Sequence, residues 1–322
     1  MVYGDNGGAT GWLVGEENRG LNCMFTMMNN ARLAVGLQGV AIAERATQQA
    51  MAYANDRRQG RAGGNGAIIN HPDVRRMLLT MRALTAAARS ICYATGAAID
   101  RSHLAKDDAA RKAADARASL LTPIAKAFST DIGTEVASLG VQVHGGMGFI
   151  EETGAAQHYR DARIAQIYEG TNGIQSIDLV TRKITMMGGA VMKGYLDELR
   201  ATVAAVKAAN DPAFGATGAR LADAVDSLDR ATAWLLGTFD KSPDAALAGA
   251  TPYLRLFASA AGGCALAEDA LAASRLNGGA DAGGRVALAR FFAENIAVQA
   301  GGLETTVTES ADSVAAVALP AA

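Results

Sequence analysis

Alanine-rich segments with apolar residues at helical spacing are the feature that most restricts the fold of this chain. Leu33, Leu37 and Val40 follow the i, i+4, i+7 spacing of one buried helix face, and the helix they define is predicted to run from about residue 21 to 57. Aromatic residues make up only 5% of the chain, and it has six prolines. This composition favours close-packed helices over strands. The sequence therefore predicts an all-α protein.

Glycine and proline breaks separate further predicted helices. The glycine-rich segment 60–66 is expected to be a loop, and Pro72 is well placed in the first turn of the second helix. A third long helix is predicted from Thr122-Pro123 to the glycine turn 145–148, and two shorter helices are predicted near 153–164 and 173–186. Four alanine-rich helices are expected in the remainder, over 195–209, 218–239, 251–274 and 286–300.

Three regions are expected along the chain. Residues 1–20 are glycine-rich with a short apolar element, Trp12-Leu13-Val14, and they resemble the last strand of a domain that would lie upstream. Roughly 20 residues cannot build a core of their own. Residues 21–187 are predicted to form a helical domain, and residues 190–322 a second helical bundle after the Gly188-Gly189 break.

Charge and composition exclude several classes of protein. A net charge of −2 predicts neither a nucleic-acid-binding protein nor a membrane-surface protein, and no uncharged apolar run reaches the roughly 18–20 residues of a membrane span. Cys23, Cys92 and Cys264 are expected to be free buried thiols in a reducing compartment, which makes the cytoplasm the expected location. His71 and His144 have no further ligands nearby, so no metal site is expected.

Glu169 is the sharpest candidate for chemistry. It follows the apolar pair Ile167-Tyr168 and precedes the Gly-Thr-Asn-Gly loop 170–173. Burial beside apolar side chains raises the pKa of a carboxyl group and strengthens it as a base. The backbone N–H and hydroxyl donors of the loop suit a phosphate or an enolate-like oxygen. The alternative is a glutamate stabilised by the dipole of the following helix.

The glycine turn Gly145-Gly146-Met147-Gly148 follows a predicted helix rather than a strand, so it is not a dinucleotide-binding fingerprint. It is either the cap of that helix or a place where the backbone approaches a flat or anionic ligand. Arg32 lies in mid-helix among apolar and small residues, where a charge must be exposed, paired or bound to a ligand. Five more arginines surround the loop 60–66, either as a solvated helix end or as contacts for pyrophosphate or CoA phosphates: Arg57, Arg58, Arg61, Arg75 and Arg76.

Three motifs together resemble the C-terminal part of the acyl-CoA dehydrogenase family. They are Val141–Phe149 (VQVHGGMGF), Arg160–Ile164 (RDARI) and Ile167–Gln175 (IYEGTNGIQ), in the family's order and at family-like spacing. The segments GWLVGEENRGL, MFTMMNNARLAVGLQG and HPDVRRMLLTM are closer to long bacterial members with an additional C-terminal helical domain, the 3-methylmercaptopropionyl-CoA dehydrogenases among them. The resemblance covers essentially the whole chain. It implies the family's C-terminal helical bundle and a second helical bundle, with residues 1–20 as a remnant of the family's middle β-domain.

The resemblance also implies an activity, the FAD-dependent α,β-dehydrogenation of an acyl-CoA thioester. Glu169 takes the place of the family's catalytic base, which removes the α-proton while the β-hydrogen leaves as hydride to flavin N5. The Glu169 backbone N–H would donate to the thioester oxygen and stabilise the developing enolate. Gly170 would line the substrate, and Arg32 would lie on the substrate side near the CoA chain.

The same resemblance assigns the FAD contacts. Thr171 matches the contact to the FAD phosphate, with Asn172 and Gly173 beside it. Arg57 matches an arginine that reaches FAD from a neighbouring subunit, and His71 matches a further position on the FAD side. The segment that approaches the adenosine part of FAD comprises Gln142, Val143, His144, Gly145 and Gly146.

Two departures affect these FAD contacts. Gln59-Gly60-Arg61 stands where many relatives have Thr-Phe-Gly, and Gly173 replaces a frequent glutamine. The family members have a helical domain and a β-domain before this region, so an N-terminally truncated form is expected. A water-filled site without the β-domain weakens every electrostatic contact in it.

The expected partners are an acyl-CoA substrate, an electron-transfer flavoprotein as electron acceptor, and further copies of the chain in a homodimer or homotetramer, but neither nucleic acid nor a membrane. One alternative is a non-catalytic helical oligomerisation module or an inactive fragment of such an enzyme. Another is an oxidase that passes electrons to oxygen. The sequence does not fix the length of the acyl chain.

Overall fold

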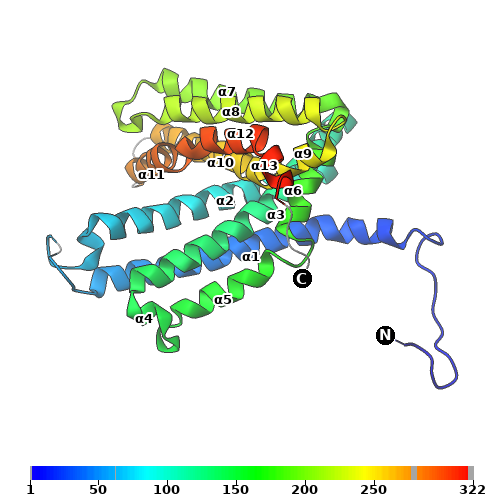
Figure 1. Ribbon diagram of the computed structural model, residues 1–322, viewed down its shortest axis with the longest axis horizontal. Helices are drawn as coiled ribbons and strands as arrows, with labels where there is room; N and C mark the ends of the chain where they lie inside the picture. Colours follow the sequence, from blue (N-terminus) through cyan, green and yellow to red (C-terminus); the bar gives the residue numbers. More distant parts are fainter. Residues whose placement is uncertain (1, 62, 277–280, 318–322) are drawn as a thin grey trace.

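The computed structural model describes residues 2–61, 63–276 and 281–317, and the predicted ranges 1–20 and 190–322 extend beyond these at the two ends. Helices dominate the described chain and no strand forms in it, which confirms the all-α class (Figure 1). The strand expected at Trp12–Val14 is therefore not formed. Trp12 is 84% exposed, and no neighbouring strand supplies hydrogen bonds to this segment.

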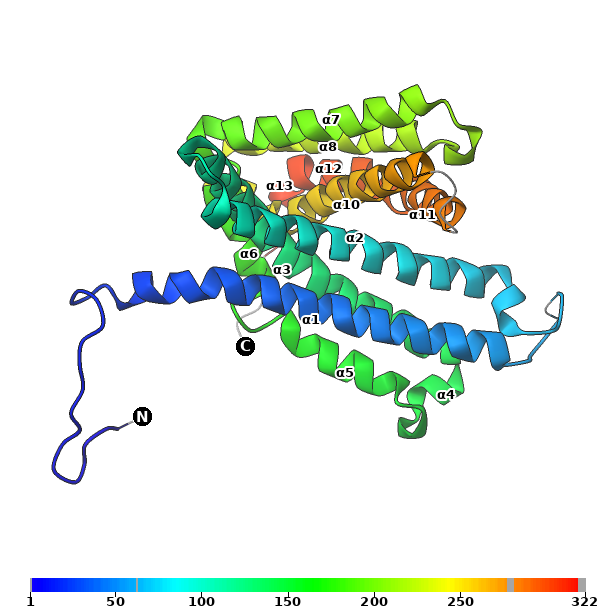
Figure 2. The ribbon, with the colours of Figure 1, turned by 180° about the vertical axis from the view of Figure 1, so that it is seen from behind.

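Three long helices form the first bundle: α1 (Gly20–Asp56), α2 (Pro72–Leu104) and α3 (Asp108–His144). They pack along one another, and the first turns of α1 project beyond the bundle (Figures 1 and 2). The predicted bounds of the first helix and the role of Pro72 as the first residue of α2 are confirmed. The core between these helices consists largely of small and aliphatic side chains, as the composition indicated.

The prediction that the third helix begins at Thr122-Pro123 is wrong. α3 begins at Asp108, and Pro123 lies inside it. The Asp107 carboxylate caps the helix by accepting a hydrogen bond from the Ala110 N–H at 2.8 Å. Residues on either side of Pro123, such as Leu120 and Ile124, are fully buried, and this packing outweighs the hydrogen bond that a proline removes.

Short helices follow α3 and carry the candidate site. They are α4 (Gly146–Phe149), α5 (Ala155–Ala165) and α6 (Asn172–Asp178). α5 confirms the helix expected near 153–164. The single helix predicted over 173–186 is divided, because α6 passes into a π turn at Leu179–Lys183, and Met187 with φ 52° and Gly188 with φ 65° then break the chain direction. The wider turn leaves Leu179, Val180 and Ile184 all buried.

The second half of the described chain lies against α2 of the first bundle. α7 (Ala190–Ala209) and α8 (Thr217–Thr238) form the outer layer, and α10 (Ala250–Arg275), α11 (Ala282–Asn295) and α12 (Ala300–Glu309) lie between that layer and α2 (Figures 1 and 2). Two short helices complete the set, α9 (Pro243–Ala248) and α13 (Ala311–Ala315). The helix expected over 286–300 is divided between α11, a 3₁₀ turn at Ala297–Gln299 and the start of α12.

α10 is the central helix of this second half. Tyr253, Leu256 and Phe257 are fully buried within it, and every residue from Leu256 to Cys264 is buried, on all sides of the helix. Among the described helices it is the one long and apolar enough to cross a membrane by length and composition, and 72% of its most apolar window is buried inside the protein. A helix that is apolar on every side is typical of a protein core as well as of a membrane span.

Candidate active site at the Glu169 loop

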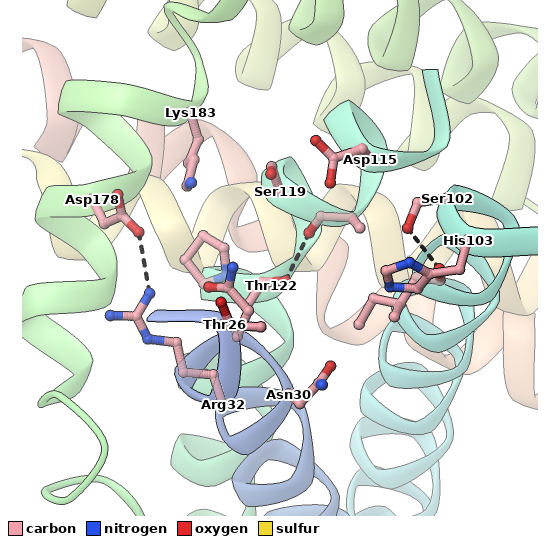
Figure 3. Close-up of a pocket in the computed structure, with 14 residues that line it drawn as sticks. Thr26, Asn30, Arg32, Ser102, His103, Asp115, Ser119, Thr122, Asp178 and Lys183 are labelled. Carbon is pink, nitrogen blue, oxygen red and sulfur yellow. Dashed lines mark hydrogen bonds and ion pairs between the residues drawn. The ribbon is translucent and has the colours of Figure 1, made fainter. Parts of the chain in front are cut away.

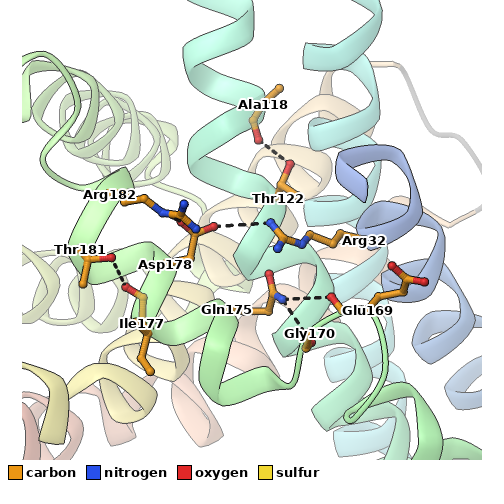
Figure 4. Close-up of polar contacts among 10 residues, drawn as sticks. All are labelled: Arg32, Ala118, Thr122, Glu169, Gly170, Gln175, Ile177, Asp178, Thr181 and Arg182. Atoms are coloured by element: carbon orange, nitrogen blue, oxygen red, sulfur yellow. Dashed lines mark hydrogen bonds and ion pairs between the residues drawn. The ribbon is translucent and has the colours of Figure 1, made fainter. Parts of the chain in front are cut away.

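The loop of residues 166–171 joins α5 to α6 and holds Glu169 in an unusual backbone conformation. Glu169 has φ 57° and Gly170 has φ 81°, both in the left-handed region. Few residues other than glycine adopt it, and such strain concentrates at functional sites. Gln175 of α6 is fully buried and donates from Nε2 to the carbonyl oxygens of Glu169 at 3.4 Å and Gly170 at 3.2 Å (Figure 4). The first turn of the next helix therefore holds the strained peptide in place.

Asn172 fastens the other side of this loop to α3. Its Oδ1 accepts a hydrogen bond from Lys126 Nζ at 2.8 Å, and its Nδ2 donates to Asp131 Oδ1 at 2.6 Å and to Thr130 Oγ1 at 2.9 Å. Its backbone N–H donates to the Gln166 carbonyl at 3.1 Å, which closes the loop on itself. The side chain of Asn172 is thus turned toward α3, and its carbonyl accepts from Ser176 Oγ at 3.0 Å.

Lys126 is a component of the site that sequence reasoning missed. Its side chain is fully buried. Burial, together with the charge of Arg32, lowers its pKa to about 8, whereas the carboxylates of Asp131 and Glu169 act to raise it. A lysine in an otherwise apolar helix segment, between Ala125 and Ala127, was the signal that could have revealed it.

The predicted burial of Glu169 by its apolar neighbours is wrong for this chain. Ile167 is 48% exposed, and the Tyr168 hydroxyl donates to Gln38 of α1. Glu169 itself is half-buried. The loop extends along the surface of the helices, so adjacent side chains leave it in different directions and do not enclose the carboxylate.

Arg32 of α1 is paired within the chain, one of the three outcomes expected for it. Its Nη1 lies 3.6 Å from Asp178 Oδ2, and both side chains are buried (Figure 4). Asp178 Oδ1 also accepts from Arg182 Nε at 2.6 Å. Three buried side-chain atoms in the described chain have no hydrogen-bond partner, namely Arg32 Nε, Asp178 Oδ2 and Gln175 Oε1. Such atoms are rare in folded proteins, and all three lie beside the Glu169 loop.

A polar cavity of about 200 Å³ lies next to Arg32 (Figure 3). Side chains from α1, α2, α3, the last residue of α6 and the π turn line it. Asp178 and Lys183 border it on one side and His103 on another, and burial lowers the pKa of Lys183. Hydroxyl and amide side chains such as Thr26 supply much of the remaining surface, so the cavity suits hydrogen-bonding groups rather than an alkyl chain.

The remaining candidates lie at the far end of the bundle, where α3 ends. The buried ring of His144 stacks on Tyr53 of α1 with ring centroids 4.4 Å apart, and its Nδ1 lies 2.7 Å from the Gly140 carbonyl. Val143 is also buried, as part of the core. Exposed groups of the predicted segment are Gln142, Gly145 and Gly146.

The glycine turn is a helix cap, as one of its two interpretations predicted. Gly145 has φ 60° and caps α3. A Cβ on Gly148 would overlap the carbonyl of Val141, so this position requires glycine. Beside Gly145 and Gly146 the space is open to 4 Å. The second interpretation, close approach of a ligand to the backbone, is thus sterically open at this turn.

The arginines around loop 60–66 differ in what they contact. Arg58 donates from Nη1 to the carbonyls of Asn55 and Asp56, both at 2.6 Å, and Arg76 is paired with Asp73, so both belong to solvated helix ends. The guanidinium group of the exposed Arg57 donates to a neutral partner, Gln59 Oε1, at 3.2 Å, and no ion pair of Arg57 occurs among the described residues.

His71 lies beside Arg57 in the same loop. Its Nε2 lies 2.9 Å from the Gln59 carbonyl. Arg57 and His71 are therefore brought together, at the end of α1 near the glycine turn.

The structure places the predicted site residues in two groups. Arg32 and Asp56 are 24 residues apart on α1, which corresponds to about 36 Å of helix. The Glu169 loop lies at the Arg32 end, and Arg57, His71 and the glycine turn lie at the other. One copy of the chain does not bring the two groups into a single pocket.

No group of three or more His, Cys, Asp or Glu side chains that could hold a metal ion occurs among the residues that the structure describes. The thiols of Cys92 and Cys264 are free and buried, and burial raises the pKa of Cys92 to about 11. Cys23 is free but exposed, contrary to the expectation that all three thiols are buried. It lies in the projecting first turns of α1.

Comparison with known proteins shows the family. The family model described as acyl-CoA dehydrogenase, C-terminal domain, matches residues 18–185. The chain belongs to the acyl-CoA dehydrogenase family. A second model, described as acetyl-CoA dehydrogenase C-terminal like, matches residues 195–318 of this acyl-CoA dehydrogenase family member.

Among curated relatives, the 3-methylmercaptopropionyl-CoA dehydrogenase of Ruegeria pomeroyi is 45% identical over 97% of this chain and 54% of its own length. A butyryl-CoA dehydrogenase of Syntrophomonas wolfei is 34% identical over 62% of this chain and 34% of its own. The chain thus spans about half the length, or less, of these curated relatives.

Solved structures share the fold at low sequence identity. An acyl-CoA dehydrogenase from Bacillus anthracis, complexed with FAD, superposes with a TM-score of 0.71 at 23% identity, over 95% of this chain and 52% of the other. ACDH-11 of Caenorhabditis elegans, in complex with C11-CoA, gives 0.72 at 19% identity, over 88% of this chain and 46% of the other.

Proposed function

We propose that this chain carries the catalytic base of an FAD-dependent enzyme that removes hydrogen from the α and β carbons of an acyl-CoA thioester. The observation that carries the proposal is Glu169, held in a left-handed conformation by Gln175 on a loop that Asn172 fastens to α3. The names of the curated relatives support this reaction class. A cytoplasmic location is proposed from the sequence alone.

The donor groups of the chain fit an extended, anionic cofactor such as FAD. The Thr171 oxygen accepts from the Ile174 N–H at 3.3 Å, which leaves the exposed hydroxyl free to donate, and Gly173 beside it is exposed. At the other end, Arg57 supplies an exposed guanidinium group and Gly145-Gly146 an open stretch of backbone. These groups would hold FAD, with the backbone of Asn172, Gln142 and the His71 side chain next to them.

The part that the chain's own residues would play in the reaction is a proton transfer. Bound FAD would supply the acceptor for the hydride from the β carbon. The Glu169 carboxylate would take the α-proton, and the Glu169 backbone N–H would donate to the thioester oxygen, where negative charge develops. Gly170 would line the substrate beside the base, and the polar cavity at Arg32 would receive hydrogen-bonding parts of the CoA chain.

The separation of the two residue groups supports an assembly of at least two copies. Arg57 directly follows α1, whose last residue is about 36 Å of helix away from Arg32, so Arg57 would contact the FAD of a neighbouring copy. α5 and its flanking loop expose three apolar side chains that a partner could cover, with Tyr159 45%, Ile164 57% and Ile167 48% exposed.

The same surface favours the alternative function, a non-catalytic helical assembly module. Sedimentation velocity of the chain with and without FAD is expected to show a dimer or tetramer under both functions. A chain that assembles but binds no FAD would favour the module, and a strictly monomeric chain would contradict the two-copy site.

The direct test of the proposal is reconstitution. The purified chain is expected to bind FAD, and addition of 3-methylmercaptopropionyl-CoA or butyryl-CoA is expected to bleach the flavin absorbance. Reduction of an electron-transfer flavoprotein, as against consumption of oxygen, would distinguish a dehydrogenase from an oxidase. Colourless protein that ignores FAD and both thioesters would overturn the proposed activity for this chain.

Arg57→Met is expected to weaken FAD binding by about 10- to 100-fold, because a hydrogen bond to a charged group is lost from an exposed anion contact. Flavin fluorescence titration measures it. Arg220→Met on α8 is the matched control, since Arg220 is also exposed and its partner is Asp223 of the same helix. If the two variants bind FAD with equal affinity, Arg57 does not contact FAD.

A further inference from the structure

We propose that Lys126 and Asp131 of α3 are positioning residues that hold both ends of the Glu169 loop and thereby set the conformation of the base. The proposal deepens the proposed function, since it rests on Glu169 acting as the base. Both residues lie in α3, which is not joined to the loop in sequence and contacts it through packing.

Asp131 ties the two ends of the loop together. Its Oδ1 accepts from Gln166 Nε2 at 2.6 Å and from Asn172 Nδ2 at 2.6 Å. Gln166 directly follows α5 and Asn172 opens α6, so one carboxylate oxygen holds the residues on either side of Glu169. Thr134 donates to Gln166 Oε1 at 3.2 Å and fixes the orientation of that amide.

Lys126 fixes the orientation of the Asn172 amide. An ammonium group is only a donor and a carboxylate only an acceptor, so the amide oxygen must face Lys126 and the amide nitrogen must face Asp131. The contacts follow this rule, with Nζ to Oδ1 at 2.8 Å and Nδ2 to Asp131 at 2.6 Å. The opposite orientation would place two donors together and two acceptors together at a buried point.

The charges around Lys126 connect it to the base. Asp131 of its own helix and Glu169 of the loop both favour its protonated form, while burial and Arg32 of α1 oppose it and bring its pKa to about 8. Removal of the Glu169 charge should therefore lower the pH at which Lys126 loses its proton. If Lys126 has only a packing role unrelated to Glu169, the pH at which it loses its proton should not change when the Glu169 charge is removed.

The first experiment measures amide hydrogen exchange of the whole chain, without FAD. Lys126→Met is expected to accelerate exchange of the amides of residues 167–173 by about tenfold relative to those of α5, because a charge-assisted hydrogen bond that orders the loop is lost. Lys193→Met, at an exposed position of α7, is the matched control and should leave the loop unchanged. Asp131→Ala, which removes the oxygen that accepts both loop hydrogen bonds, is expected to act like Lys126→Met and decides the matter if Lys126→Met does not fold.

The second experiment follows the titration of Lys126 by NMR of ε-labelled lysine. Its midpoint is expected near pH 8 and should fall in Glu169→Gln but not in Glu152→Gln, an exposed glutamate near α5. The proposal would be overturned if loop exchange in Asp131→Ala were no faster than in Lys193→Met, or if the titration midpoint of Lys126 were the same in Glu169→Gln as in the wild type. Neither the exchange nor the titration measurement needs FAD or turnover. A chain that binds no FAD would therefore refute the proposed function without affecting the test of Lys126 and Asp131.

Discussion

Glu169→Gln is expected to abolish flavin bleaching by an acyl-CoA, with a fall in rate of at least about 100-fold, because a general base contributes roughly 10²–10⁴ to a rate. The glutamine has almost the same shape, so the left-handed loop and its bonds to Gln175 should persist. Rapid mixing of the FAD-loaded chain with 3-methylmercaptopropionyl-CoA measures the rate. Binding of FAD should be nearly unchanged, because the resemblance places Glu169 on the substrate side.

Two comparisons make this result specific. Glu152→Gln removes an equally charged but exposed side chain outside the loop and should bleach at the wild-type rate. Glu169→Asp keeps the charge but withdraws the carboxylate by one methylene, and a displacement of about 1 Å costs on the order of 10² in rate. A Glu169→Gln chain that bleaches as fast as Glu152→Gln would show that another group is the base.

Local patterns were sufficient for the elements whose ends carry their own signals. α1 has a sustained helical period, α2 has Pro72 at its first position, and the glycine turn marks the end of α3. Pro123 misled the prediction because its cost is local, whereas the packing that repays it comes from α1 and α2, which are distant in sequence. A strand at Trp12–Val14 failed for a related reason, since a strand forms only with a partner.

The residues of the candidate site likewise fall into those that the sequence revealed and those that required the structure. Glu169 was visible in the sequence because the proposed base, Gly170 and the Thr171 hydroxyl proposed to contact phosphate lie in one short motif. Lys126 and Asp131 were not, because the spacing on α3 does not reveal which loop lies against it. The distance between the Glu169 loop and Arg57 also required the structure, although the length of the predicted first helix already implied that its two ends lie far apart.

Gly36 and Gly39 of α1 form a glycine seam, where the helix lies directly against the backbone of α3. This close contact positions α3, and we expect Gly39→Ala to disrupt it. A Cβ on Gly39 would overlap the carbonyl of Ser129 and lie 2.8 Å from the Cα of Thr130, and one on Gly36 would lie 2.5 Å from the carbonyl of Ala125. These contacts are backbone atoms, which cannot rotate away. Overpacking of this kind costs about 1–3 kcal/mol or more, so we expect a loss of free energy of unfolding at the upper end of that range.

Denaturation with urea would measure this loss, and Gly194→Ala is the matched control. Gly194 lies within α7, is exposed, and has no atom within 4 Å of its Cβ position, so alanine there should stabilise the chain by roughly 0.5–1 kcal/mol through helix propensity. If Gly39→Ala lowers the free energy of unfolding and Gly194→Ala raises it, the effect at Gly39 comes from contact between the helices and not from helix propensity. Ser129 and Thr130 lie between Lys126 and Asp131 on α3, so widening the seam should also accelerate exchange in the Glu169 loop. A Gly39→Ala chain as stable as wild type would mean that α1 and α3 do not approach this closely in solution.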